Sequence, residues 1–119
     1  MVDDHDERET LLLRGSLDMC VLAILDREPL HTYSVVERLR EEGFETGYGT
    51  VYPLVTRLRR AGLLDQRVEA GSGPARHVLS LTPAGRDGLR RWSAQWRRSV
   101  ARVSTVLEAT PDRGRRRVR

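Results

Sequence analysis

Apolar residues recur at the three- and four-residue spacing of helices in four stretches of the chain. These stretches cover residues 11–25, about 34–43, about 48–61 and 83 to about 109. We therefore predict four helices. Outside them, residues 1–9 are expected to be a disordered acidic N-terminus, and residues 111–119 a disordered basic tail.

Local signals mark several helix ends. Thr32 or Ser34 is expected to cap the second helix, and Ser34 with Glu37 fits a capping box. The last helix begins after Thr82, because threonine followed by proline is typical of an N-cap and a first helical residue. Glycines that fit helix ends follow the second and third helices, at Gly43 and Gly62.

Two short runs between the third and last helices favour strands. Residues 63–69 and 76–81 flank a stretch rich in glycine and proline, which predicts a β-hairpin with a loose tip. Three helices followed by a hairpin form a winged helix-turn-helix. We therefore predict a mainly α fold, with this domain over residues 10–82 and a C-terminal dimerisation helix over residues 83–110.

The third predicted helix has two chemically different faces. Its apolar side consists of Val51, Leu54, Val55 and Leu58. Its other side carries Thr50, Pro53, Thr56, Arg57 and Arg60. Small residues lead into it, and such a helix suits docking against a polyanion.

The charge of the chain is unevenly distributed. Residues 1–45 hold 5 Arg and 12 acidic residues, a balance of −7, whereas residues 46–119 hold 16 Arg and 5 acidic residues, a balance of +11. This segregation indicates a polyanionic partner for the second part. All 21 basic residues are arginine, which suits bidentate contacts to phosphate and guanine but also fits a GC-rich genome.

Composition disfavours several other classes of protein. No apolar run approaches the length of a membrane span, and the acidic start is unlike a signal peptide. The single cysteine, Cys20, cannot form an internal disulfide, so we expect a cytoplasmic protein, with Cys20 as a buried thiol or a redox sensor. The scattered histidines give no metal-binding spacing, and we find no catalytic constellation, so no cofactor, metal or enzyme activity is expected.

Four blocks of sequence carry a family resemblance. They are Leu13-Arg14-Gly15-Ser16-Leu17 with Val21-Leu22, Pro29-Leu30-His31-Thr32-Tyr33, Gly49-Thr50-Val51-Tyr52-Pro53 with Leu58 and Gly62-Leu63, and Gly73-Pro74-Ala75-Arg76 with Leu81-Thr82-Pro83-Ala84-Gly85-Arg86. In this order and spacing the chain resembles the PadR family of bacterial transcriptional regulators, from about Leu12 to Trp96.

The resemblance implies a dimeric repressor, of the small subfamily in which a single C-terminal helix makes the dimer. Many members control efflux, detoxification or stress genes, and some are released by aromatic small molecules. The chain departs from the pattern at three positions. Thr32 replaces a common glycine, Leu79 replaces a common aromatic residue in the wing, and Gly47 replaces a serine cap, which leaves Thr46 as the expected cap.

Candidate DNA contacts come from three parts of the fold. The start of the second helix supplies Tyr33 and Ser34, the third helix supplies Tyr48, Gly49, Thr50, Tyr52, Pro53 and Arg57, and the wing supplies Arg76 and His77. Arginine can bind guanine in the major groove, and hydroxyls can bind phosphate. Tyr33 and Tyr52 fit packing roles as well, and Pro53 is expected only near the helix start.

An apolar stripe at heptad spacing follows the last helix. It consists of Leu89, Trp92, Trp96, Val100, Val103 and Leu107. We predict that this stripe, with Leu13 and Leu17 of the first helix, pairs two copies of the chain as a homodimer with twofold symmetry. Trp92 and Trp96 either pack in that interface or form a platform for a planar ligand.

The sequence therefore predicts a homodimeric repressor that binds a pseudo-palindromic double-stranded DNA operator and is released by a small molecule. The alternative is a winged-helix module for protein interaction that does not bind DNA. The two differ in salt dependence, because DNA affinity falls steeply as salt rises.

Overall fold

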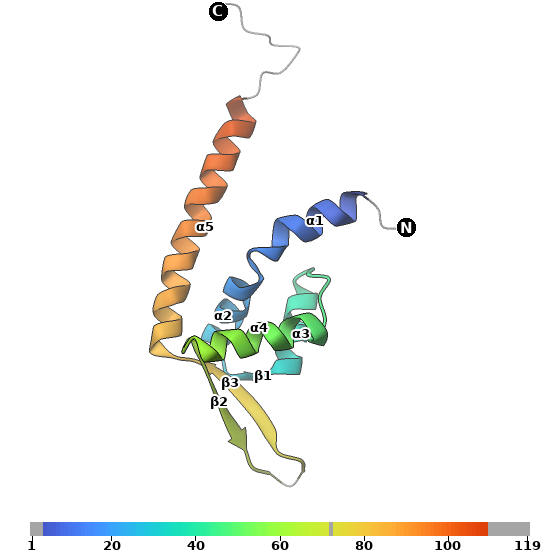
Figure 1. Cartoon of the computed structure of the whole chain (residues 1–119), viewed down its shortest axis with the longest axis vertical. Coiled ribbons are helices and arrows are strands. Elements are labelled where there is room, and N and C mark those ends of the chain that lie inside the picture. The colour runs from blue at the N-terminus through green and yellow to red at the C-terminus, as the bar shows by residue number, and fades with distance from the viewer. Residues whose placement is uncertain (1–3, 72, 110–119) are drawn as a thin grey trace, which may run out of the picture.

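The computed structural model of the chain describes residues 4–71 and 73–109. The elements in chain order are α1 (Asp4–Arg14), α2 (Leu17–Arg27), β1 (Leu30–His31), α3 (Thr32–Glu41), α4 (Tyr48–Arg60), β2 (Leu64–Glu69), β3 (Arg76–Leu81) and α5 (Pro83–Ala109). Figure 1 shows the β2–β3 hairpin and α5 leaving the helical domain in opposite directions, while α1 projects from its side. The mainly helical fold with a β-hairpin wing was predicted correctly.

The core lies between α2, α3, α4 and a three-stranded antiparallel sheet with strand order β1-β3-β2. β2 and β3 pair from Leu64 opposite Leu81 to Glu69 opposite Arg76, and Leu30 of β1 lies opposite Leu79 of β3. Leu79, which departs from the family pattern, is fully buried. This leucine therefore belongs to the core of the domain and not to the exposed surface of the wing.

The helix ends at Gly43 and Gly62 agree with the prediction. Both glycines have positive φ, 97° and 80°, a conformation that costs glycine little. The residues that follow them donate back across the helix end, from Phe44 N to Leu39 O and from Leu63 N to Leu58 O, both at 3.0 Å. These bonds are the Schellman pattern of helix termination.

The first predicted helix is wrong in two respects. Residues 11–25 do not form one helix, because Ser16 donates to the Leu13 carbonyl through both its N–H, at 3.0 Å, and its hydroxyl, at 2.9 Å. These bonds close a tight turn over residues 13–16 and separate α1 from α2. The structure is also helical from Asp4, where we expected disorder over residues 1–9; residues 1–3 and the predicted tail at 111–119 lie outside the described residues.

Two predicted caps and the place of Pro53 also differ from the structure. α3 begins at Thr32 and α4 follows Gly47, both without a side-chain cap, so neither Thr32 nor Ser34 caps α3 and no Thr46 cap forms. Pairing of the two-residue strand β1 with β3 fixes the start of α3 at Thr32, two residues before Ser34. Pro53 is the sixth residue of α4, so the Gly49 carbonyl lacks its usual acceptor bond.

Thr82 connects α5 to the rest of the domain. Its hydroxyl donates to the Gly62 carbonyl at 2.7 Å and accepts the Gly85 N–H at 2.9 Å, while its own N–H donates to Leu63 O at 3.2 Å. The predicted N-cap is therefore confirmed. The same hydroxyl also links α5 to the turn that ends α4.

We expect Thr82→Ala to lower the free energy of unfolding by about 1–2 kcal/mol, because an N-cap and a second hydrogen bond are lost together. Urea denaturation followed by circular dichroism measures this change. Thr105→Ala is the matched control, since the Thr105 hydroxyl only donates to Ala101 O on the surface of α5. Equal stability of the two variants would contradict the linking role of Thr82.

Candidate nucleic-acid interface

α4 separates into the two faces that its sequence predicts. Val51, Leu54, Val55 and Leu58 are buried in the core. On the opposite side Tyr48, Gly49, Thr50, Tyr52, Pro53 and Arg57 are exposed. The domain therefore presents a helix whose outer surface is free of its own core.

Two tyrosines dominate the first turns of this exposed face. The rings of Tyr48 and Tyr52 stack with centroids 5.3 Å apart and an angle of 19° between their planes. Both are about half exposed, at 49% and 50%, so Tyr52 is not a core residue. Because each ring restricts the other, the two hydroxyls are held on one side of the helix. Thr56 is less available, since its hydroxyl donates to Tyr52 O at 3.1 Å.

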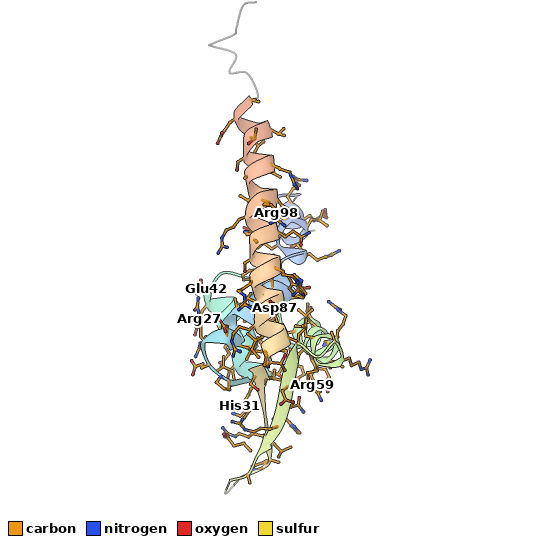
Figure 2. The ribbon with its side chains drawn as sticks, turned by 90° about the vertical axis from the view of Figure 1, so that its left-hand side faces the viewer. Arg27, His31, Glu42, Arg59, Asp87 and Arg98 are labelled. Atoms are coloured by element: carbon orange, nitrogen blue, oxygen red, sulfur yellow. The ribbon has the colours of Figure 1, made fainter. Side chains whose placement is uncertain are left out.

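The last turn of α4 is strongly basic. Arg57, Arg59 and Arg60 are exposed, and α4 contains no acidic residue. In the part of the chain that the structure describes, the ion pairs involve other arginines, so these three guanidinium groups are available to an external anion. Figure 2 shows Arg59 on the side of the domain away from Arg27.

The wing carries its candidate residues on the strand β3. Arg76 and His77 are exposed. The ring of His77 is held in place by Gln66, whose Nε2 lies 3.0 Å from His77 Nδ1. The backbone carbonyl oxygen of His77 lies 3.3 Å from Nδ1 of His31 on β1. These contacts fix the base of the wing relative to the helical domain.

The start of α3 completes the set of predicted contacts. Tyr33 is 61% exposed, which argues against a packing role within this chain, whereas Ser34 is half-buried. Sequence reasoning missed Arg40, whose Nε donates to Thr46 O at 2.8 Å and holds the loop before α4. It also missed the exposed Arg67 on the wing strand β2. Neither residue belongs to a recognisable motif.

The apolar stripe of α5 divides into two parts. Leu89 and Trp92 pack against the core of their own chain. Farther along, Trp96, Val100, Val103 and Leu107 are 41%, 41%, 59% and 67% exposed. Leu11 and Leu12 of α1 are also exposed, at 59% and 70%, whereas the predicted interface residues Leu13 and Leu17 are half-buried. The outward apolar surface of α1 therefore consists of residues that we did not single out.

The two tryptophans lie beside the junction of α1 and α2. They border a hollow of about 260 Å³, which is also lined by Gly15, Asp18, Met19, Gln95 and Ser99. Cys20 lies nearby in sequence and packs against the core. Burial raises the pKa of the Cys20 thiol above its ordinary value, so the reactive thiolate is disfavoured. A structural role therefore fits Cys20 better than redox sensing.

Other kinds of site find little support in the described residues. Over 4–71 and 73–109, no group of three or more histidine, cysteine or acidic side chains could hold a metal ion. None of the described helices combines the length and apolar character that a membrane span requires.

Comparison with known proteins places this geometry in a family. The model of the transcriptional regulator PadR-like family matches residues 21–91. The chain is similar to the transcriptional regulator Rv3488 of Mycobacterium tuberculosis, with 37% identity over 76 residues, which cover 64% of this chain and 71% of the relative.

Solved structures show the same architecture. A PadR family transcriptional regulator from Eggerthella lenta superposes with a TM-score of 0.83 and 34% identity, covering 88% of this chain and 93% of that chain. Bacillus subtilis PadR in complex with operator DNA superposes with a TM-score of 0.58 and 21% identity, covering 64% and 45%. At 21% identity, the likeness to the Bacillus subtilis protein concerns the fold alone.

Proposed function

Because the chain belongs to the PadR-like family of transcriptional regulators, we propose that it is a homodimeric repressor that binds a pseudo-palindromic DNA operator. Its family and relatives are regulators and not enzymes. A protein that acts on the chromosome in this way works in the bacterial cytoplasm. A small molecule that binds the dimer would release it from DNA.

The exposed face of α4 is the observation that carries the DNA-binding proposal. A helix of this kind fits the major groove of B-DNA, where Arg57 can donate to guanine and Thr50 can contact a base or phosphate. The stacked Tyr48 and Tyr52 supply hydroxyls at the groove edge. Arg76 on the wing and Tyr33 on α3 would bind flanking phosphates, which position the protein but do not specify sequence.

The exposed apolar residues of α1 and α5 support the homodimer. Trp96, Val100, Val103 and Leu107 extend beyond the core of the domain, and Leu11 and Leu12 form a second exposed apolar surface. Their helices also carry opposite charge, with Glu7 and Glu9 on α1 and Arg97, Arg98 and Arg102 on α5. Packing α1 of one copy on α5 of the other would cover both surfaces. Two α4 helices about 34 Å apart would then reach successive major grooves.

A planar ligand beside Trp92 and Trp96 would act on this dimer. The hollow next to them lies where α5 faces the α1–α2 junction. Stacking on an indole ring favours flat molecules, and Arg91 and Arg97 neighbour the two tryptophans in sequence. Ligand binding there would change the separation of the two α4 helices, provided that the ligand binds the released state more tightly.

Selection of duplexes from a random library tests DNA binding directly. We expect one sequence with twofold symmetry to be enriched, and its affinity in fluorescence anisotropy to fall steeply between low and moderate salt. The same measurement with a scrambled duplex gives the specificity ratio. Failure to enrich any sequence, together with binding that does not depend on salt, would favour the protein-interaction module.

We expect Arg57→Ala to weaken binding to the selected duplex by about tenfold, because a bidentate contact to guanine is lost. Anisotropy at fixed salt measures the change, and preference at one base pair should relax. Arg27→Ala removes the same charge from the far side of the domain and serves as the control. If Arg57→Ala instead weakens all sequences equally and reduces the salt slope by about one, Arg57 contacts phosphate.

A further inference from the structure

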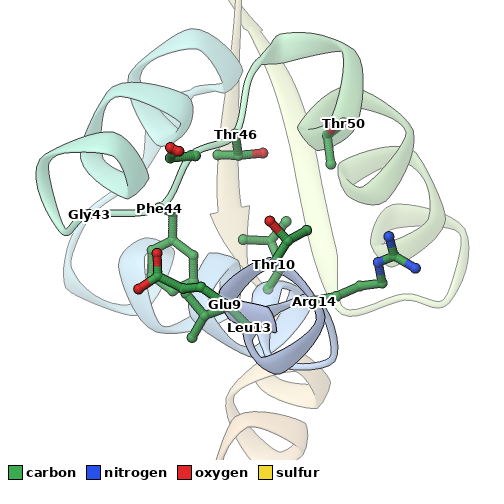
Figure 3. A pocket seen from close by; sticks show the side chains of 10 residues that line it. Glu9, Thr10, Leu13, Arg14, Gly43, Phe44, Thr46 and Thr50 are labelled. Atoms are coloured by element: carbon green, nitrogen blue, oxygen red, sulfur yellow. The ribbon is translucent and has the colours of Figure 1, made fainter. Parts of the chain in front are cut away.

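A second cavity lies between α1 and the start of α4 (Figure 3). It shares no lining residue with the hollow beside the tryptophans. Its volume is about 200 Å³. It is lined by Glu9, Thr10, Leu13, Arg14, Leu17, Gly43, Phe44, Glu45, Thr46 and Thr50. We refer to these residues as the α1–α4 cavity. The cavity lies between three segments. These are α1, which carries the outward apolar surface, the loop before α4, and α4, the helix proposed to read DNA.

The size of the cavity limits what it can hold. A cavity of about 150 Å³ is enough for benzene, whereas drug-sized ligands occupy roughly 300–1,000 Å³. The α1–α4 cavity lies between these values. It therefore fits a molecule with a single ring and a short substituent.

The lining combines an apolar part with hydroxyl groups. Leu13, Leu17 and Phe44 supply the apolar part, and the hydroxyls come from Thr10, Thr46 and Thr50. The Thr46 hydroxyl is buried and has no hydrogen-bond partner in the described structure, which costs free energy. Because threonine has more than one staggered χ1 rotamer, this hydroxyl can turn toward the cavity and donate to a ligand acceptor. It gives up no existing hydrogen bond when it turns.

The charges around the cavity select against anions. Glu9 and Glu45 oppose the single positive charge of Arg14, so the lining carries a net charge of −1. An anionic ligand would meet repulsion and would also lose hydration on entering. A neutral molecule with a carbonyl, ester or ether oxygen avoids both costs.

We propose that the α1–α4 cavity is an effector site for a neutral single-ring molecule that carries a hydrogen-bond acceptor. Its effector role rests on the proposed DNA-binding function, whereas ligand binding itself does not. This site is separate from the hollow beside Trp92 and Trp96.

α1 can transmit occupancy of this site to the dimer. Its inner side, with Thr10 and Leu13, lines the cavity, while Leu11 and Leu12 face outward. Among the described residues, α1 makes only sparse contacts with other elements, so a ligand beneath it can change its position at little cost. Thr50 lies in the same cavity and on the exposed side of α4. One ligand therefore contacts both the proposed pairing helix and the proposed reading helix.

Titration of the ¹⁵N-labelled full-length protein with acetophenone, and separately with benzoate, tests the site by amide chemical shifts. These molecules share a ring and differ in charge. We expect acetophenone to shift the amides of Leu13, Thr46 and Thr50, and benzoate to bind at least about fivefold more weakly. Equal binding of benzoate, or shifts confined to Trp92 and Trp96, would overturn the assignment.

Variants of Thr46 separate the hydroxyl from the shape of the cavity. Thr46→Val removes an unsatisfied hydroxyl, so it should fold at least as stably while binding acetophenone about fivefold more weakly. Thr46→Ser keeps the hydroxyl and should bind within about twofold of the unmodified protein. Wild-type affinity in Thr46→Val would show that the hydroxyl does not bind the ligand, and the proposal would fail.

A filling variant tests the location and the effector role together. Thr10→Phe places a ring in the cavity and should abolish acetophenone binding, whereas Arg8→Phe, on α1 outside the lining, should not. Saturating acetophenone should weaken binding of the selected duplex to the unmodified protein by at least about fivefold. It should leave the duplex affinity of Thr10→Phe unchanged.

These experiments distinguish failure of the ligand site from failure of the DNA-binding proposal. Acetophenone binding without a change in duplex affinity would overturn the effector role. Acetophenone binding by a protein that selects no duplex would overturn the DNA-binding proposal and support the cavity as a ligand site. Val103→Glu is expected to prevent pairing of two copies. If acetophenone changes the amide chemical shifts only in that variant, a second copy fills the cavity, and the ligand site would be wrong.

Discussion

Replacing Gly85 by alanine is expected to lower the free energy of unfolding by about 3 kcal/mol. A Cβ atom at this buried position would lie 2.1 Å from the Leu63 carbonyl oxygen and 2.7 Å from Leu81 Cδ1. The carbonyl cannot easily move, because it accepts the Thr82 N–H and belongs to the turn that ends α4. The variant must therefore shift α5 away from the domain.

Urea denaturation at fixed protein concentration measures this loss, with tryptophan fluorescence as the probe, since both tryptophans lie on α5. Gly88→Ala is the matched control one turn later. Its Cβ would meet only side-chain atoms at 3.7 and 3.8 Å, which is ordinary contact, so it should stabilise α5 by about 0.5–1 kcal/mol. Equal midpoints for Gly85→Ala and the unmodified protein would contradict the close packing of α5 on Leu63.

The second large effect concerns pairing of two copies. We expect Val103→Glu to shift the protein from dimer to monomer and to weaken operator binding by about 100-fold or more, because two linked half-site contacts become independent. Val103 is 59% exposed in the single chain, so a glutamate there costs the fold little, whereas a dimer would bury it without a partner. Sedimentation analysis gives the oligomeric state, and anisotropy gives the operator affinity.

Ala101→Glu controls for the added charge. Ala101 is exposed and lies two residues before Val103, which places it about 160° away around the helix. It should leave the dimer intact and reduce operator affinity by no more than a few fold, through charge alone. If Val103→Glu remains a dimer with unchanged operator affinity, the exposed stripe of α5 is not the pairing surface.

Local sequence signals predicted the elements that position the interface. Gly43 and Gly62 mark helix ends because their positive φ suits glycine, and Thr82 caps α5 as its pairing with Pro83 indicates. The apolar spacing of α4 predicted which side is buried, because a helix of 3.6 residues per turn places residues three and four apart on one face. The exposed residues of that helix follow from the same pattern.

Other features depend on contacts that no local pattern encodes. The strand β1 exists only because Leu30 and His31 pair with β3, nearly fifty residues away. The α1–α4 cavity likewise depends on how α1 lies relative to the loop before α4. Neither element length nor periodicity contains this information, since both arise from segments that meet only after folding.

From α3 onward, the sequence by itself determined the order of the helices and the hairpin strands and the polar face of α4, because these depend on backbone preferences and periodicity within each segment. The family was recognised from four blocks of sequence. The tertiary structure decided which part of each apolar stripe remains exposed. On α5, Leu89 and Trp92 cover the domain's own core, while the stripe from Trp96 onward extends past it. α5 continues beyond the end of the core. Where the core ends in three dimensions therefore decides which residues of the stripe pack within the chain and which form the surface proposed for a second copy.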